Sequence, residues 1–177
     1  MPLYNLIVLL ILMQHLTLYE FNPGASLDNW MVVNDGVMGG RSKGSLILNE
    51  EGHGVFAGEI SLENYGGFSS LRYRTDHIVV NDFTTVELKV KGDGKRYQFR
   101  IREGQADYYS YIQYFETSGE WQTIVIPLDS FYPVFRGRRL NLPNYRGKSL
   151  EEIGFLIGNK RRETFRLEIH YIRLGSD

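Results

Sequence analysis

Alternation of apolar and polar residues with a period of two runs through most of this chain, and this feature most limits the folds open to it. The stretches TTVELKVKG (84–92) and KRYQFRIRE (95–103) show it most clearly. Successive side chains of a β-strand point to opposite faces, so each stretch predicts a strand with one buried face. The predicted inward-facing residues are Val86, Leu88 and Val90 in the first stretch and Tyr97, Phe99 and Ile101 in the second.

Further strands are predicted from EWQTIVIPL (120–128), IGFLIG (153–158) and ETFRLEIHYIRL (163–174). The sequence GDGK, Gly92–Lys95, contains the residues of a tight hairpin between the first two strands. Ser149 resembles an N-cap for one short helical turn. No long segment has the 3.6-residue period of a helix. Many short strands separated by turn residues predict an all-β, antiparallel β-sandwich.

The length of 177 residues fits one domain with a substantial core, and we expect a single β-sandwich domain over residues 18–177. Residues 1–17 differ from the rest, because Leu6–Met13 is an uninterrupted apolar run. The run has the length of a signal-peptide core and is too short to span a bilayer, so we expect no transmembrane span. The segment 1–17 is either a signal or a first apolar element packed on the core.

Charge and cysteine content exclude several classes of function. The formal net charge of −1 gives no overall field to attract nucleic acid, so we expect no nucleic-acid partner. Cysteine is absent, which excludes disulfides, thiolate catalysis and Cys-ligated zinc. Arg outnumbers Lys 14 to 6, which favours fixed, bidentate pairing with carboxylates or other anions.

Gly40–Gly44, GRSKG, fits the G-x-S-x-G pattern of a hydrolase nucleophile turn, with Ser42 as nucleophile. His170 and Asp129 are formal candidates for the other two members of a triad. The pattern has a mechanism only where a strand turns into a helix, whereas a strand and a turn are predicted after Ser42. A serine hydrolase is therefore a remote alternative. The glycines also miss the spacing of phosphate-binding loops, although a backbone nest for one anion beside Arg41 stays open.

Metal ligands are sparse, and we expect no cofactor. The four histidines are scattered along the chain, without metal-ligand spacing. Asp35 and Glu63 could join a calcium site together with backbone carbonyls, which leaves calcium as the alternative.

Two long motifs, WMVVNDGVMGGRSKGS (30–45) and VFAGEISLENYGGFSSLRYR (55–74), carry a family resemblance. The later pieces GDGKRYQFRIR, WQTIVIPLDSF and LEEIGFLIGNK fit the same pattern. Over residues 18–174 the chain resembles the complex I intermediate-associated protein family. The resemblance implies a jelly-roll β-sandwich of the galactose-binding-domain-like type, similar to some carbohydrate-binding modules.

Members of this family in eukaryotes act as assembly factors for mitochondrial respiratory complex I, and they bind membrane-arm intermediates without being enzymes. The present chain resembles a bacterial member, because it has no Arg-rich transit peptide. We expect it in the cell envelope if residues 1–17 are a signal, and otherwise in the cytoplasm beside the membrane.

Short polar residues and glycines of the two motifs, together with Arg41 and with Met38 as a hydrophobic contact, are the first candidate binding residues, because they would line one end of the sandwich. They are Asn34, Asp35, Met38, Gly39, Gly40, Arg41 and Ser42 in the first motif and Glu63 and Asn64 in the second. For Met38 the alternative is a place in the core. The alternative is that the Asn and Asp side chains hydrogen-bond their own loop backbones, as turn residues commonly do.

Arginines in the polar registers of two predicted strands form the second candidate set. These are Arg72, Arg74, Arg100 and Arg102. If the strands share a sheet, the arginines would form a basic face suited to an acidic partner segment, a polar sugar or a lipid head group. The alternative is cross-strand pairing with Glu and Gln on a solvated face.

Tyrosines and a basic loop complete the candidates. In DYYSYIQYFE (107–116), Tyr109 and Tyr111 alternate with Tyr108 and Tyr114, so one pair is core and the other is exposed. We take Tyr111 as a candidate contact. The loop 135–148 contributes Arg136 and Arg138, with a solvated crossover loop as the alternative.

The predicted function is binding of a protein partner, such as subunits of a membrane complex, without catalysis. The alternative is a carbohydrate-binding module that recognises a polysaccharide. Exposed, coplanar tyrosines would favour sugar, and an apolar patch rimmed by arginines would favour a protein partner. Ser42 within hydrogen-bond reach of His170 would favour the enzyme.

Overall fold

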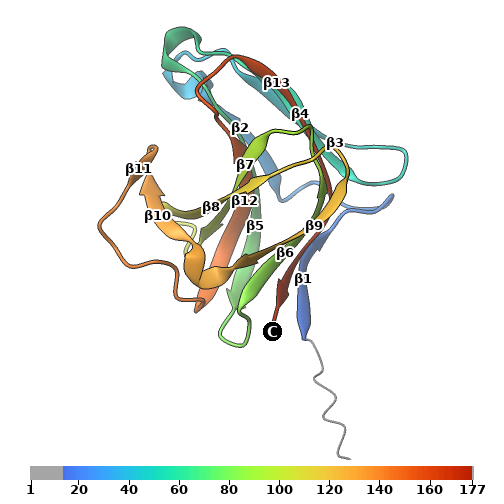
Figure 1. Cartoon of the computed structure of the whole chain (residues 1–177), viewed down its shortest axis with the longest axis vertical. Coiled ribbons are helices and arrows are strands. Elements are labelled where there is room, and N and C mark those ends of the chain that lie inside the picture. Colours follow the sequence, from blue (N-terminus) through green and yellow to red (C-terminus); the bar gives the residue numbers. More distant parts are fainter. Residues whose placement is uncertain (1–13, 177) are drawn as a thin grey trace, which may run out of the picture.

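The structure is a computed structural model that describes residues 14–176, and within them it contains strands and short 3-10 turns but no α-helix. Two antiparallel sheets pack face to face (Figure 1). The six-stranded sheet contains β1 (His15–Glu20), β3 (Lys43–Leu48), β4 (Gly54–Ile60), β6 (Thr85–Lys91), β9 (Trp121–Pro127) and β13 (Glu163–Gly175). The seven-stranded sheet contains β2 (Trp30–Asn34), β5 (Ser69–Val79), β7 (Arg96–Arg102), β8 (Ser110–Glu116), β10 (Tyr132–Phe135), β11 (Arg138–Arg139) and β12 (Ser149–Ile157).

Each sheet has a strand order that differs from the order of the strands along the chain. The six-stranded sheet runs β3-β4-β13-β6-β9, and β1 pairs with the second half of β13 beside β4. The seven-stranded sheet runs β11-β10-β8-β7-β12-β5-β2. The two sheets enclose one apolar core, so the predicted all-β sandwich is confirmed.

The period-two alternation predicted the buried residues of β6 and β7 correctly. The predicted inward-facing side chains of both strands are buried. Burying one such apolar side chain contributes about 1.5–3 kcal/mol. The strands predicted in 120–128, 153–158 and 163–174 are present as β9, β12 and β13.

The predicted hairpin at Gly92–Lys95 is wrong. Strand β6 pairs with β9 and β13, whereas β7 pairs with β8 and β12 in the other sheet. The segment therefore crosses from one sheet to the other, and Gly94 is its only residue with positive φ. Both strands point apolar faces into the same core from opposite sides, which a hairpin within one sheet would not allow.

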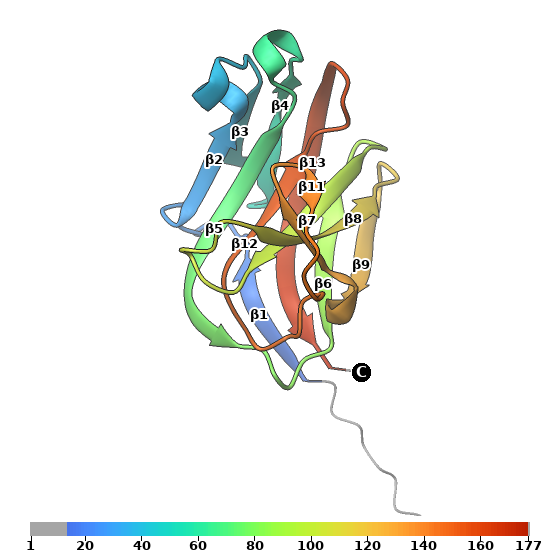
Figure 2. The same cartoon turned by 90° about the vertical axis from the view of Figure 1, so that its left-hand side faces the viewer.

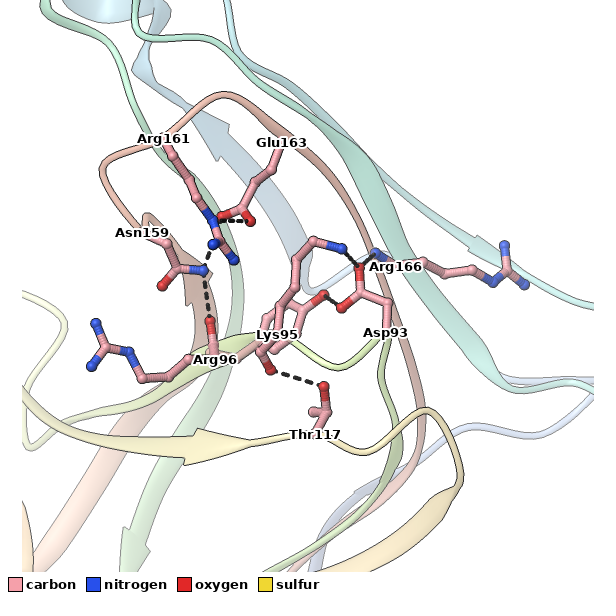
Figure 3. A network of polar contacts seen from close by, with 9 residues as sticks. Asp93, Lys95, Arg96, Thr117, Asn159, Arg161, Glu163 and Arg166 are labelled. Carbon is pink, nitrogen blue, oxygen red and sulfur yellow. Dashed lines mark hydrogen bonds and ion pairs between the residues drawn. The ribbon is translucent and has the colours of Figure 1, made fainter.

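A polar network fixes this crossing (Figure 3). The carboxylate of Asp93 accepts hydrogen bonds from Lys95 Nζ at 2.7 Å, from the Tyr97 hydroxyl at 2.9 Å and from the Arg166 amide at 3.0 Å. Thr117 Oγ1 donates to the Lys95 carbonyl at 2.8 Å. These bonds tie the crossing to β13 and to the end of β8.

The predicted helical turn after Ser149 is also wrong, because residues 149–157 form β12 between β5 and β7. Leu150 and Ile153 are buried in the core, and Glu152 points to the opposite face. Burial of these apolar side chains in a central strand overrides the local capping signal. The short 3-10 turns are η1 (Asp35–Met38), η2 (Glu63–Tyr65) and η3 (Leu128–Ser130).

The two ends of the sandwich differ. The connections through η1 and η2, drawn in blue and green, lie together at one end (Figures 1 and 2), whereas β1 begins and β13 ends at the other end. Strand β1 begins at His15, whereas the apolar run Leu6–Met13 lies outside the described residues. Within residues 14–176 no helix has the length and apolarity needed to cross a membrane.

Candidate functional site

Asp35 joins the two sequence motifs. Its buried carboxylate accepts hydrogen bonds from the Ser42 amide at 3.0 Å and from the Ser42 hydroxyl. It also accepts from the amides of Gly67 at 2.6 Å and Phe68 at 3.3 Å. Burial alone would raise the pKa of Asp35, but these hydrogen bonds outweigh it and hold the pKa below its usual value. The carboxylate is therefore a fixed anchor between the loops.

Other side chains add to this connection. Asn34 Oδ1 accepts from the Gly44 amide at 3.0 Å and from the Ser69 hydroxyl at 2.7 Å. Asn64 Nδ2 donates to the Gly39 carbonyl at 2.9 Å. We name residues 34–44 and 61–69, joined in this way, the two-loop tip. The side chains of Asn34, Asp35 and Asn64 thus hydrogen-bond to backbone groups of the loops. This is the alternative to ligand binding that the sequence left open for them.

Two glycines lie against the Asp35 carboxylate. A Cβ at Gly40 would lie 2.2 Å from Asp35 Oδ1, and one at Gly66 would lie 2.5 Å from Oδ2. Such distances are too short for any side chain, so glycine is required at both positions. Gly39 has the left-handed φ of 85° that ends η1, and the Met38 side chain lies outside the described residues.

The outer surface of the two-loop tip carries three exposed apolar side chains beside charged and polar ones. Tyr65 is 98% exposed, and Leu62 and Phe68, three residues before and after it in the sequence, are 46% and 36% exposed; these three residues are named the apolar patch. Asn64 and Tyr65 have φ values of 54° and 61°, which side-chain-bearing residues rarely adopt in succession. At the edge of the patch, Arg41 forms an exposed ion pair with Glu63 at 2.8 Å. With one arginine, itself paired with Glu63, the tip matches only in part the apolar patch rimmed by arginines that would favour a protein partner.

Ser42 does not form the catalytic pair considered from the sequence. Its hydroxyl bonds to Asp35 and to the backbone of Ser61, and its side chain is buried. His170 instead lies on β13 beside Glu20, at 3.7 Å, and the ring of His53. The Ser42 hydroxyl thus has a structural role.

The two carboxylates considered for calcium have separate partners. Asp35 binds amide and hydroxyl donors, and Glu63 binds Arg41. A calcium site of the kind considered above would need oxygens of both carboxylates directed at one ion. Within residues 14–176 no group of three or more His, Asp or Glu residues could hold a metal ion.

The second set of candidates lies on the outer face of the seven-stranded sheet. Strand β12 brings Glu152 between β5 and β7, opposite Arg74 and Arg102 in the strand register. The Glu152 carboxylate is 3.6 Å from Arg102 Nε, 3.8 Å from Arg74 Nε and 3.9 Å from Arg72 Nε. The predicted basic face therefore exists, and it is built around a single glutamate.

Arg100 belongs to the same basic face, on β7 opposite Gly154 of β12. Burial, together with the charges of Arg72 and Arg102, lowers the pKa of Arg100 to about 10. Within the described part of the chain its guanidinium has neither a hydrogen bond nor an ion pair within 4.0 Å. Arg102 differs, because its Nε donates to the Ser110 hydroxyl at 3.0 Å.

The tyrosine prediction chose the wrong side of β8. Tyr111 is buried on the inner face, where its ring packs against Tyr145 at 5.2 Å. Tyr114 is on the outer face, with the guanidinium of Arg96 4.4 Å from the ring centroid. Because Tyr111 faces inward and lies in the core, it is not available to contact a partner.

The basic loop 135–148 is partly ordered as a strand. Arg136 and Gly137, with φ values of 47° and 76°, form the turn of a hairpin between β10 and β11. Arg136 lies over the ring of Phe135, and Arg138 is exposed at the start of β11. Both arginines are distant in the strand order from the two-loop tip, because β11 is at the opposite edge from β2.

Comparison with solved structures shows the same fold. The family 11 carbohydrate-binding module of the cellulase Lic26A-Cel5E of Clostridium thermocellum aligns with a TM-score of 0.66 and 16% identity, over 91% of this chain and 94% of that one. The same module in complex with a β-1,3-1,4-mixed-linked tetrasaccharide gives 0.66 and 18%, over 90% and 94%. The agarase AgWH50C gives 0.63 and 12%, over 92% and 24%.

Comparison of sequences gives the family. The chain is 26% identical to the mitochondrial complex I intermediate-associated protein 30 of Mus musculus, over 94% of this chain and 58% of that protein. The Drosophila melanogaster protein of the same name is 27% identical, over 90% and 62%. The chain thus spans less than two thirds of these relatives. Because the family model for complex I intermediate-associated protein 30 matches residues 19–169, the chain belongs to this family.

Proposed function

We propose that the chain binds a protein partner during assembly of a respiratory membrane complex, without catalysing a reaction, and that the two-loop tip is its docking surface. The observation that carries the proposal is Tyr65, fully exposed between Leu62 and Phe68. Tyrosine is enriched among the residues that dominate binding energy at protein interfaces. The names of the mouse and fly relatives associate them with complex I intermediates, which supports the same role here.

The backbone of the tip supports this assignment. Holding Asn64 and Tyr65 at positive φ costs on the order of 1–3 kcal/mol each, and such conformations cluster at functional sites. The Asp35 anchor keeps the loop in this conformation without a ligand. A partner would therefore meet a preorganised surface and lose little binding energy to ordering it.

A carbohydrate-binding role is the alternative that the fold neighbours suggest. Sugar rings stack on free aromatic faces, but the rings of Tyr114 and Tyr132 each have a guanidinium over one face. Within residues 14–176 the Tyr65 ring makes no contact with another aromatic ring, so it is not part of a stacked aromatic strip. These features favour a protein partner over a polysaccharide.

The test compares Tyr65→Ser with wild type in affinity capture from detergent-solubilised membranes of the source cells, with mass spectrometry of the captured proteins. Tyr108→Ser is the matched control, because Tyr108 is also exposed but precedes β8, near the opposite end of the seven-stranded sheet. We expect wild type and the control to retain respiratory-complex subunits, and Tyr65→Ser to lose at least nine tenths of them.

Equal capture of these subunits by wild type and Tyr65→Ser would refute the tip as the docking surface. Retention of the wild-type protein on mixed-linked glucan, without any respiratory subunit captured, would replace the assembly role by sugar binding. The predicted envelope or membrane-peripheral location is checked by fractionating the same cells.

A further inference from the structure

An arginine cluster on the outer face of the seven-stranded sheet carries more positive charge than the carboxylate within it can balance. Arg72, Arg74, Arg100 and Arg102 surround the single buried carboxylate of Glu152. Three of them approach it only at 3.6–3.9 Å, beyond ordinary hydrogen-bond length. The cluster thus has three more positive charges than negative ones, in a partly buried position.

Arg100 is the member without a partner. A guanidinium has five N–H donors, and those of Arg100 have no acceptor among residues 14–176, although none of its nitrogens is completely buried. A small space beside Arg100 is lined by Ser70, Ser110, Glu152 and Gly154, with room for about one water-sized group, ≈ 10 Å³. The space is too small for a sugar ring, but one oxygen of a carboxylate or of another oxyanion fits.

We propose that Arg100, with Arg72 and Arg102, binds a carboxylate carried by an acidic polypeptide segment that lies across this face. This inference rests on the proposed function, because it takes the partner to be a protein. It concerns the outer face of the seven-stranded sheet and not the two-loop tip. A planar guanidinium matches a carboxylate with two parallel hydrogen bonds, which is stronger and more directional than a lysine contact. The ligand supplies the acceptors that Arg100 lacks.

Further arginines along the same face favour an extended segment over a single small ion. Arg96 on β7 and Arg139 on β11 lie over the rings of Tyr114 and Tyr132. Strand register places these two tyrosines on the same side of the sheet as Arg100. Acidic side chains spaced along an extended chain would reach these arginines in turn.

The test is fluorescence anisotropy of a labelled hexaglutamate peptide titrated with the full chain at low salt. Arg100→Gln is compared with Arg162→Gln, an exposed arginine that pairs with Glu59 outside this face. We expect Arg100→Gln to weaken binding at least tenfold and Arg162→Gln to change it less than twofold. Glu152→Gln removes the competing carboxylate, so it is expected to tighten binding several-fold.

Hexaglutamine is the matched uncharged probe, and circular dichroism confirms that each variant is folded. Equal affinity of wild type and Arg100→Gln for hexaglutamate would overturn the proposal. Complete displacement of the peptide by equimolar inorganic phosphate would also overturn it, in favour of a site for small oxyanions. The probe is a peptide and not the natural partner. Failure of this test therefore does not decide the Tyr65 capture test, and failure of the capture test does not decide this one.

Discussion

The amide of Gly67 donates a hydrogen bond of 2.6 Å to Oδ2 of Asp35, which lies 32 residues earlier in the chain. The bond joins the connection after β2 to the connection after β4. The two motifs that stand out in the sequence are therefore halves of one structural unit. Each half is positioned by the other, and the apolar surface around Tyr65 depends on both.

Replacing Asp35 by alanine is predicted to destabilise the protein strongly. The substitution leaves the amides of Ser42, Gly67 and Phe68 without their acceptor in a buried site. Hydrogen bonds to charged groups contribute about 1.5–3 kcal/mol each, and we expect a total loss of about 3 kcal/mol in the free energy of unfolding. Urea denaturation measures it, with the exposed Asp129→Ala as control. A loss below about 0.5 kcal/mol would contradict the anchoring role.

The same carboxylate predicts a pH dependence. Because folding lowers the pKa of Asp35, its contribution is fully present above the unfolded pKa of about 3.9 and is lost as pH falls through the folded value. Asp35→Asn cannot titrate. The difference in unfolding free energy between wild type and this variant should therefore be largest above about pH 4 and shrink below it. A difference that stays constant down to the lowest measurable pH would exclude the linkage.

Glycine at position 40 is predicted to be required for stability. In Gly40→Ala the new Cβ would meet Asp35 Oδ1 at 2.2 Å, so the anchor or the loop must shift, at a cost of about 1–3 kcal/mol. Gly36→Ala is the matched control, because a Cβ there meets nothing within 4 Å. Thermal unfolding followed by circular dichroism distinguishes the two. Equal melting temperatures for both variants would show that the close contact is unimportant.

Tyr65→Gly is predicted to separate stability from binding. The exposed ring contributes little packing, and glycine removes the cost of the left-handed conformation, about 1–2 kcal/mol. Part of that gain is offset by the greater freedom of glycine in the unfolded chain. We expect a slightly higher urea midpoint together with lost partner capture. A lower midpoint would mean that the ring stabilises the tip itself.

Strand faces were predictable from the sequence because they depend on local alternation. Val90 and Tyr97 both read as inward-facing, and both are buried. The sheet to which each strand belongs was not predictable, because that choice depends on partners far away in the chain. Turn residues at Gly92–Lys95 suit either a hairpin or a crossing between sheets.

The candidate site was predicted only in part. Asp35 and the arginines were identified by their motif and register, but the loop-joining role of Asp35 was only one of two alternatives. Tyr65 was missed, because its exposure follows from a left-handed backbone that adjacent residue types do not specify. The following Gly66 and Gly67 were the available signal of an unusual turn. Glu152 was missed because a capping pattern assigned it to a helical turn.

Glu152→Gln is predicted to lower stability in a way that added anions reverse. The substitution removes the only carboxylate among Arg72, Arg74 and Arg102, and breaking a buried ion pair costs up to about 3–5 kcal/mol. Two of these arginines are partly exposed, so screening reduces the loss to about 2 kcal/mol. Glu116→Gln, exposed on the same face, is the control. Thermal unfolding with sodium acetate, compared with sodium chloride at equal ionic strength, should restore more stability to Glu152→Gln than to wild type or the control. If acetate raises all three melting temperatures equally, the arginine cluster does not bind carboxylates.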